Sequence, residues 1–179
     1  MKKYDVIIIG GGPAGLVASK LLVAFGKSVA IVEAHKLGGD CTHTGCIPSK
    51  TLLKAAQAVH ETKNLPKYGI KVQELKLDTS NVLSHVKNIV DEIYSHETPE
   101  IFKEAGVDVI EGFATFKNQN SVLVNKESYE AKNFIIATGS RPNIPKIKGI
   151  ETVNYLSNEN IFNLKKIPDS LIIVGTGVI

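Results

Sequence analysis

Short apolar runs and helical apolar patterns alternate along the first part of the chain. Residues 6–9 form a continuous apolar run of Val and Ile, which is typical of a strand buried on both faces of a parallel sheet. Residues 16–25 carry apolar side chains at helical spacing, and Gly26 is well placed to end that helix. Residues 28–33 predict a second strand, which ends in the acidic residue Glu33. The pattern therefore predicts a strand–helix–strand unit.

Helical patterns continue through the middle of the chain. An apolar pattern at helical spacing follows Cys46, and the polar stretch 62–76 predicts a connector. Thr79 or Ser80 can cap a second long helix. The apolar stripe of this second helix consists of Val82, Leu83, Val86, Ile89, Val90 and Ile93. Residues 98–99, a Thr-Pro pair, predict a stop and a restart, with one kinked helix as the alternative. We therefore expect a helical hairpin.

Strand patterns return after the hairpin, separated by turn signals such as Asn118-Gln119-Asn120. The predicted strands are residues 107–110, 112–116, 121–124 and 129–131. We expect them to form a small antiparallel meander. A buried strand at 134–137 follows, and it leads into a turn at 138–142. The fold class predicted from these elements is α/β, with a parallel sheet, a helical hairpin and an antiparallel β-meander.

The first predicted strand runs directly into a glycine-rich turn. Gly10, Gly12 and Gly15 match the pattern G-x-G-x-x-G, with a helix behind them and Glu33 about twenty residues further on. In this pattern the first glycine allows a tight turn, the second lets the backbone approach a pyrophosphate, and the third lets helix and strand pack closely. The helix N-terminus stabilises phosphate charge. Together with its strand, helix and acid, the pattern predicts a dinucleotide-binding unit.

A second unit of this kind begins at the end of the sequence. Residues 171–174 repeat the buried-strand pattern, and Gly175 and Gly177 follow them like the first two glycines of another fingerprint. The sequence ends at Ile179, before the position that a third glycine of the pattern would occupy. We therefore divide the chain into three parts. They are a dinucleotide-binding domain at 1–147, a linker at 148–169, and the first strand and turn of a second dinucleotide-binding domain at 170–179.

Composition narrows the function classes. The chain of 179 residues is 43% hydrophobic and carries a net charge of +3. The length and the hydrophobic content suit one globular domain or slightly more. The net charge is too small to indicate binding to nucleic acid or to an anionic membrane. The apolar run at 6–9 is too short for a signal peptide, and no stretch is long enough to span a bilayer. We expect a cytoplasmic protein, in which a disulfide is more often catalytic than structural.

Both cysteines of the chain lie in one short segment, residues 38–50. Cys41 and Cys46 are separated by four residues and stand at the start of a predicted helix, where unpaired backbone N–H groups favour a thiolate. Pro48 is compatible with a first helical turn. The simplest interpretation is a redox-active dithiol. Three alternatives stay open: a structural disulfide, a metal site that includes His43, and two unrelated buried thiols.

The sequence Gly-Gly-Asp-Cys-x4-Cys-Ile-Pro-Ser-Lys over residues 38–50 resembles the active-site signature of the flavin-dependent pyridine nucleotide–disulfide oxidoreductases. That family includes dihydrolipoamide dehydrogenase, glutathione reductase and mercuric reductase. The commoner form of this signature has Thr or Ser at the position of Asp40. This difference concerns the subfamily and not the resemblance to the family. The fingerprint at the N-terminus, with the dithiol directly behind it, resembles the family's FAD domain, and residues 170–179 resemble the opening of its NAD(P)H domain.

The resemblance implies an FAD site and a set of residues that line it. Lys50 is implied to approach the flavin ring, Ala114 to contact FAD through its backbone, and the turn after residue 137 to form a second FAD-contacting segment. The implied cofactor-binding residues are Gly10, Gly12, Pro13, Ala14, Gly15, Glu33, Gly39, Asp40, Cys41, Lys50, Ala114, Thr138, Gly139 and Ser140. No resident metal is implied.

The resemblance also implies an electron path. NAD(P)H is the co-substrate that reduces FAD, and the Cys41–Cys46 disulfide is reduced in turn, with Cys46 nearer the flavin and Cys41 as the interchange thiol. The substrate is a small-molecule disulfide, such as lipoamide, or a metal ion, such as mercuric ion. The family's dimerisation domain, with an acid/base His–Glu pair from the partner subunit, has no counterpart in residues 1–179.

We therefore expect a homodimer in the full-length protein, and we expect residues 1–179 alone to be inactive. Two other readings stay open. The chain is an FAD-binding fragment without turnover, or it is a thiol-based metal-binding module.

Overall fold

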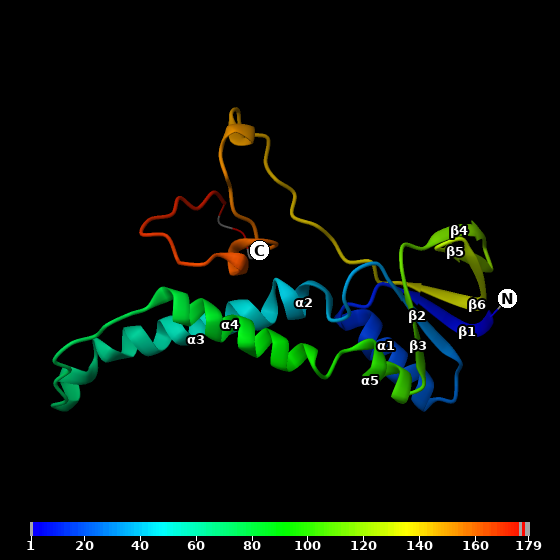
Figure 1. Cartoon of the computed structure of the whole chain (residues 1–179), viewed down its shortest axis with the longest axis horizontal. Helices are drawn as coiled ribbons and strands as arrows, with labels where there is room; N and C mark the ends of the chain where they lie inside the picture. Colours follow the sequence, from blue (N-terminus) through cyan, green and yellow to red (C-terminus); the bar gives the residue numbers. More distant parts are fainter. Residues whose placement is uncertain (1, 176, 178–179) are drawn as a thin grey trace.

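In a computed structural model that describes residues 2–175 and 177, the chain forms a six-stranded mixed sheet in the order β3-β2-β1-β6-β5-β4 (Figure 1). The strands are β1 (Lys2–Ile9), β2 (Val29–Glu33), β3 (Val107–Glu111), β4 (Thr115–Asn118), β5 (Ser121–Val124) and β6 (Glu127–Ile136). The pairs β1–β2, β2–β3 and β1–β6 are parallel, whereas β4–β5 and β5–β6 are antiparallel. The predicted α/β class and its parallel sheet are confirmed. The antiparallel meander consists of β4, β5 and β6, so the prediction that residues 107–110 belong to it is wrong: β3 pairs in parallel with β2 at the opposite edge of the sheet.

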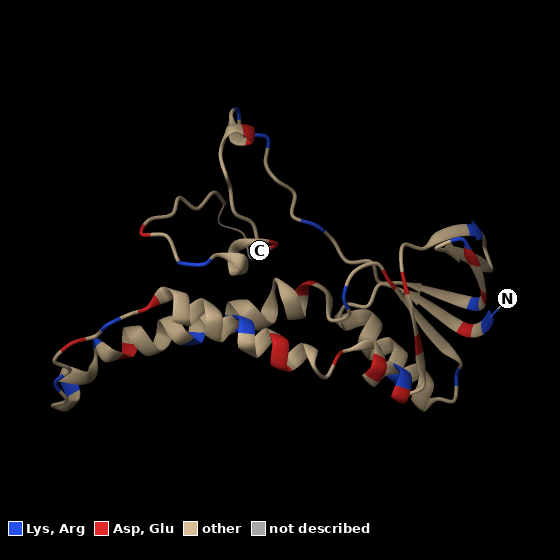
Figure 2. Ribbon diagram, in the orientation of Figure 1, with Lys and Arg blue, Asp and Glu red and all other residues tan. Residues whose placement is uncertain are grey.

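The helices are α1 (Pro13–Ala24), α2 (Gly39–His43), α3 (Cys46–Thr62), α4 (Thr79–Tyr94) and α5 (Pro99–Glu104), with short 3-10 turns η1 (Leu65–Tyr68), η2 (Ile150–Thr152) and η3 (Ile161–Asn163). Helices α3 and α4 lie side by side as an arm that extends away from the sheet (Figure 1). The predicted helical hairpin is therefore confirmed. Acidic and basic residues are interspersed over both the sheet and the arm (Figure 2).

The strand β1 is buried on both faces, as its continuous apolar run predicts. Val6 and Ile8 face one core cluster, which includes Leu16 of α1 and Phe102 of α5. Ile7 faces a second cluster on the opposite side of the sheet. The second cluster also contains Val122 and Val124 of β5 and Ala131 of β6. The meander thus curls over the face of the parallel strands that α1 leaves open.

The two strands predicted at 129–131 and 134–137 are one strand, β6. Its residues pair with β1 from Lys2↔Tyr129 to Ile9↔Ile136, while its first four residues also pair with β5. The polar residues between the predicted strands stay within β6 because β1 provides a continuous hydrogen-bonding partner along its length. Residues 112–114, expected in a strand, connect β3 to β4 instead.

Only part of the apolar pattern of α1 faces the core. Gly15, Leu16 and Ser19 are buried, whereas Val17 and Phe25 are 59% and 77% exposed. At Gly15 the helix approaches the strand too closely for any side chain, while Leu16 inserts into the core. Gly26 follows the helix with φ +72° and donates to the Val23 carbonyl, so the predicted end of the helix is confirmed.

The ends of the other helices combine confirmed and wrong predictions. Asp78 caps α4 by accepting hydrogen bonds from the Ser80 and Asn81 amides at 2.9 and 3.3 Å, so the prediction of Thr79 or Ser80 as cap is wrong by one or two positions. A carboxylate one residue earlier reaches the same orphan N–H groups. The stop and restart at Thr98-Pro99 is confirmed, since α4 and α5 are separate helices.

The predicted strand at 171–174 is wrong for this chain. These residues form no strand, and their side chains are between 52% and 93% exposed. A strand needs a neighbour that accepts its hydrogen bonds, and none of the six strands in the described part of the chain pairs with this segment. Gly175 and Gly177 are described, but Thr176, Val178 and Ile179 of the second fingerprint lie outside the described residues. Among the residues that are described, no helix combines the length and apolarity needed to cross a membrane.

We expect Phe102→Ala to lower the free energy of unfolding by about 3–5 kcal/mol, because it removes a fully buried ring from the core cluster beneath α1. Phe25→Ala is the matched control, and this exposed site is expected to change stability by less than about 0.5 kcal/mol. Urea unfolding followed by circular dichroism measures both. Equal losses for the two variants would contradict the assignment of Phe102 to the core.

Candidate functional site

The turn between β1 and α1 is built from glycines that have different structural tasks. Gly10 has φ +107°, and a Cβ there would overlap the carbonyl of Ala137. A Cβ on Gly15 would overlap the carbonyl of Gly10 and press on Ile8. Both positions therefore exclude any side chain for reasons internal to the fold, which are the tight turn and the close approach of helix and strand.

Gly12 differs because the described residues leave open space beside it. A Cβ on Gly12 would meet only the Cα of Gly39, at 3.9 Å. Gly12 is the N-cap of α1 and has no side chain to cap the helix, and Pro13 and Ala14 follow in the first turn. The first-turn N–H groups of a twelve-residue helix thus face an open space, which is the arrangement that binds an anionic phosphate.

Glu33 stands at the end of β2 and reaches the same turn. Its Oε2 accepts a hydrogen bond from the Gly11 amide at 2.6 Å, and its Oε1 accepts one from the His35 amide at 2.8 Å. The acid predicted from its distance in sequence therefore lies beside the fingerprint. Its carboxylate can accept ribose hydroxyls at the edge where dinucleotides bind in such sheets.

The dithiol segment packs directly on the glycine turn. The Gly38 amide donates to the Gly11 carbonyl at 2.8 Å, and a Cβ on Gly39 would lie 2.8 Å from the Cα of Gly12. Gly38 and Gly39 have φ values of +96° and +57°. These two glycines allow the backbone to turn against Gly11 and Gly12, and α2 with Asp40 and Cys41 begins there.

Cys41 and Cys46 are both thiols, so the structure describes the reduced dithiol. Cys41 lies in α2 and is half-buried, whereas Cys46 is the first residue of α3 and is exposed. The hydrogen bond with the Cys46 side chain, followed by burial, raises the pKa of the Cys41 thiol above its ordinary value. The neighbouring Cys46 is therefore the largest influence on the pKa of the Cys41 thiol.

The helix start acts on this pair as expected, but it does not dominate. A hydrogen bond from the Cys46 backbone and the nearby charge of Lys50 both lower the pKa of Cys41, and both are smaller than the opposing effects. The helix start thus favours a thiolate, as expected, but the effects that raise the pKa of Cys41 are larger in this structure.

The remaining residues of the predicted set come from three other parts of the chain. The Ala137 amide donates to the Ile9 carbonyl at 2.8 Å, which brings the turn at Thr138, Gly139 and Ser140 next to Gly10. These three residues are exposed. Ala114 is partly buried and packs against the second core cluster, to which Ile9 also belongs. Lys50 is exposed one turn beyond Cys46 on α3.

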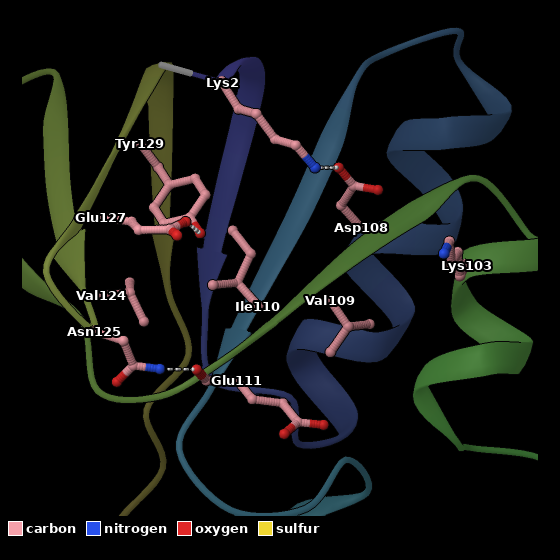
Figure 3. A pocket seen from close by; sticks show the side chains of 10 residues that line it. All are labelled: Lys2, Lys103, Asp108, Val109, Ile110, Glu111, Val124, Asn125, Glu127 and Tyr129. Atoms are coloured by element: carbon pink, nitrogen blue, oxygen red, sulfur yellow. Dashed lines mark hydrogen bonds and ion pairs between the residues drawn. The ribbon is translucent and has the colours of Figure 1, made fainter.

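One hollow of about 400 Å³ lies away from these residues, between β3 and the meander (Figure 3). Its polar groups are largely paired with one another. Asp108 accepts hydrogen bonds from the Tyr4 hydroxyl at 2.6 Å and from Lys2 at 3.4 Å, and the Tyr129 hydroxyl donates to Glu127 at 2.7 Å. None of the residues predicted for the site lines this hollow, and we assign it no role in the site.

Sequence reasoning did not identify the residues that hold the dithiol segment from the other side. The Thr42 hydroxyl donates to Glu97 Oε2 at 2.7 Å, and the rings of His43 and Tyr94 make an edge contact at 5.1 Å. Their separation along the chain leaves no local signal. The metal alternative gains no support, since the part of the chain that the structure describes holds no group of three His, Cys, Asp or Glu side chains suited to a metal.

Comparison with known proteins gives a consistent result. The family model described as pyridine nucleotide-disulphide oxidoreductase matches residues 4–179. Mercuric reductase from Lysinibacillus sphaericus is 35% identical over 98% of this chain, and dihydrolipoyl dehydrogenase from Acholeplasma laidlawii is 38% identical over 99%. A dihydrolipoyl dehydrogenase from Bacillus subtilis (strain 168) is 37% identical over 98%. The chain spans 32%, 54% and 38% of the lengths of these three proteins, in that order.

We expect Cys46→Ala to lower the pKa of Cys41, because the side-chain hydrogen bond that raises it most is lost while the backbone N–H of residue 46 is retained. Cys46→Ser is the matched control, since its hydroxyl can replace the lost partner and should keep more of the raised pKa. The ultraviolet absorbance of the thiolate, followed against pH, reports both. A pKa in Cys46→Ala equal to or above that of Cys46→Ser would contradict the contact.

Proposed function

The chain belongs to the pyridine nucleotide–disulphide oxidoreductase family, and we propose that it forms the FAD-binding, dithiol-bearing part of a flavoprotein disulfide oxidoreductase. The observation that carries this proposal is the packing of the dithiol segment on the fingerprint turn, through the Gly38 amide and the Gly11 carbonyl. That contact sets a redox-active pair beside a site suited to a dinucleotide. Neither half of the arrangement alone would support the proposal.

The residues present fit FAD. The space beside Gly12 and the open N-terminus of α1 suit the pyrophosphate, and Glu33 is placed for the adenosine ribose. Pro13, Ala14 and Gly15 continue the turn, and Gly39, Asp40 and Cys41 border it from the dithiol segment. On the other side the exposed turn at Thr138, Gly139 and Ser140 faces the same edge, with Ala114 and Lys50 as the outer members of the set. When bound, FAD supplies a carrier for two electrons between NAD(P)H and the protein disulfide.

The two cysteines perform the thiol chemistry. Reduction of the Cys41–Cys46 disulfide takes up two electrons and two protons and gives the dithiol that the structure describes. With a disulfide substrate, one thiolate attacks a substrate sulfur, a substrate thiolate leaves, and the second cysteine attacks the mixed disulfide to release the other half.

We propose Cys41 as the attacking thiol and Cys46 as the flavin-side cysteine. Exposure in this structure points the other way, because Cys46 is the more exposed of the two. The assignment therefore depends on the cover that bound FAD provides for Cys46.

The names of the relatives suggest a class of substrate, which we give as a proposal. Among the relatives are mercuric reductases and dihydrolipoyl dehydrogenases, so we propose a metal ion or a small-molecule disulfide. We also propose that residues 1–147 are FAD-domain sequence, 148–169 a linker, and 170–179 the start of an NAD(P)H domain. The full-length protein would act as a homodimer, and residues 1–179 alone would show no turnover of NAD(P)H.

The dithiol proposal predicts a reversible disulfide between Cys41 and Cys46. Titration of free thiols before and after mild reduction of an oxidised sample should show a gain of two thiols per chain, and Cys41→Ser should abolish that gain without forming dimers. A sample in which no thiols are gained, and in which mass spectrometry shows no overoxidation, would contradict the proposal.

The cofactor proposal predicts that Gly12→Val weakens FAD binding by roughly tenfold or more, since its side chain would fill the space reserved for the pyrophosphate. The protein itself has room for a small side chain at this position, so the melting temperature of Gly12→Ala should match that of the parent chain. Val17→Ala, on the exposed side of the same helix, is the control. Titration of FAD fluorescence measures affinity, and equal affinities for Gly12→Val and parent would remove the fingerprint from the site.

A further inference from the structure

The helix that carries Cys41 is held weakly by its own backbone. Helix α2 has only five residues and no side-chain cap. The amide of Thr42 reaches the Gly38 carbonyl at a long 3.5 Å, while Thr44 reaches Asp40 at 2.9 Å. A single helical turn is not stable by itself, because too few hydrogen bonds offset the ordering of its residues. The orientation of Cys41 therefore depends on contacts from outside the turn.

One such contact comes from Glu97, in the corner between α4 and α5. Its Oε2 accepts a hydrogen bond from the Thr42 hydroxyl at 2.7 Å, across 55 positions of sequence. Thr42 is 3% exposed and directly follows Cys41. A Cβ on Gly38 would lie 2.5 Å from the same carboxylate oxygen, so Glu97 also occupies the space beside the N-cap of α2.

The rest of the corner supports the same segment. Tyr94, at the end of α4, meets the ring of His43 at 5.1 Å and carries the ammonium group of Lys36 over its face at 5.5 Å. A ring nitrogen of His43 is also 2.8 Å from the Leu37 carbonyl. The segment 36–43 is thus clamped between the fingerprint turn on one side and the α4–α5 corner on the other.

We propose that Glu97 is a positioning residue for the dithiol: its hydrogen bond to Thr42 holds α2 in the orientation that aims Cys41 at Cys46. This inference rests on the proposed redox role of the two cysteines. A carboxylate accepts a stronger hydrogen bond than a neutral group does, so Glu97 holds the buried hydroxyl more firmly than an amide or water would. Its part is geometric, and it takes no proton or electron from the dithiol.

The consequence is a shift in the redox equilibrium. In the reaction with glutathione, the protein dithiol and one oxidised glutathione give the protein disulfide and two reduced glutathione molecules. Disulfide formation needs the two sulfurs to meet, and a turn that samples other orientations lowers their effective concentration. Without Glu97 the disulfide should be less favoured relative to glutathione.

The test measures this equilibrium constant for the 179-residue chain in glutathione buffers of graded ratio, with the fraction oxidised read by thiol alkylation and mass spectrometry. Glu97→Ala should lower the constant by about threefold to tenfold, where tenfold corresponds to ~30 mV. Glu97→Gln keeps an oxygen acceptor and should recover part of the loss. Glu92→Ala removes an exposed carboxylate from α4 that makes no side-chain hydrogen bond within the described residues, and should leave the constant unchanged.

A second pair of variants changes Thr42, the other partner of this hydrogen bond. It provides the test if Glu97→Ala fails to fold. Thr42→Val keeps the shape and removes the donor, so it should lower the constant as Glu97→Ala does, whereas Thr42→Ser keeps the donor and should not. In the Thr42→Val background, Glu97→Ala should have no further effect, because both changes break one interaction.

Three results would overturn the inference, and they differ in what else they affect. Parent-like constants in both Glu97→Ala and Thr42→Val, with a parent chain that does form the disulfide, would reject the role of Glu97 alone. A parent chain that forms no Cys41–Cys46 disulfide at any glutathione ratio would reject the proposed redox function and this inference with it. A loss in Glu97→Ala that Glu97→Gln and Thr42→Ser share with it would also reject the inference, because the loss would not follow the hydrogen bond.

Discussion

The close packing of two glycine segments, residues 10–12 and 38–39, is the constraint on which the candidate site depends. The Gly38 amide bonds to the Gly11 carbonyl, and the Cα atoms of Gly12 and Gly39 face each other too closely for a Cβ on Gly39. Backbones approach this closely only where side chains are absent. The contact ties the turn that begins α1 to the turn that begins α2, so a nucleotide site and a dithiol share one edge of the sheet.

The fingerprint turn on one side of this contact is supported by the core, whereas the dithiol segment on the other side is held by fewer contacts. The fingerprint turn rests on β1, whose two faces contribute to both core clusters, and on Gly15, where α1 meets the strand. The dithiol segment contributes little to these clusters, and Leu37 beside it is its link to the first of them. Its only helix before Cys46 is a single turn, and its order comes from side chains of a different part of the chain, Glu97 and Tyr94. A dithiol that has to open and close suits a segment held by a few separable contacts.

The electrostatics of the pair follow from the same geometry. Cys41 faces Cys46 closely enough that the shared hydrogen bond raises the pKa of Cys41, and the backbone and Lys50 only partly oppose this effect. Cys41 is therefore less readily deprotonated than an ordinary thiol. Much of the remaining apolar surface, including the outer side of α1 and the segment 171–174, is exposed in the described chain, and it takes no part in the site.

Local patterns in the sequence were sufficient for most of the elements and for the residues proposed to carry the chemistry. The apolar run of β1, the spacing of Gly10, Gly12 and Gly15, and the pair Cys41 and Cys46 follow from short-range periodicity and sterics, which act wherever such residues occur. The tertiary structure alone decided which distant groups meet. It placed Glu97 on Thr42, joined two predicted strands into β6 along β1, and left 171–174 without a strand partner. A hydrogen bond across 55 positions, or a strand that needs a neighbour, leaves no periodic trace in the sequence, because its partner is chosen by packing in three dimensions.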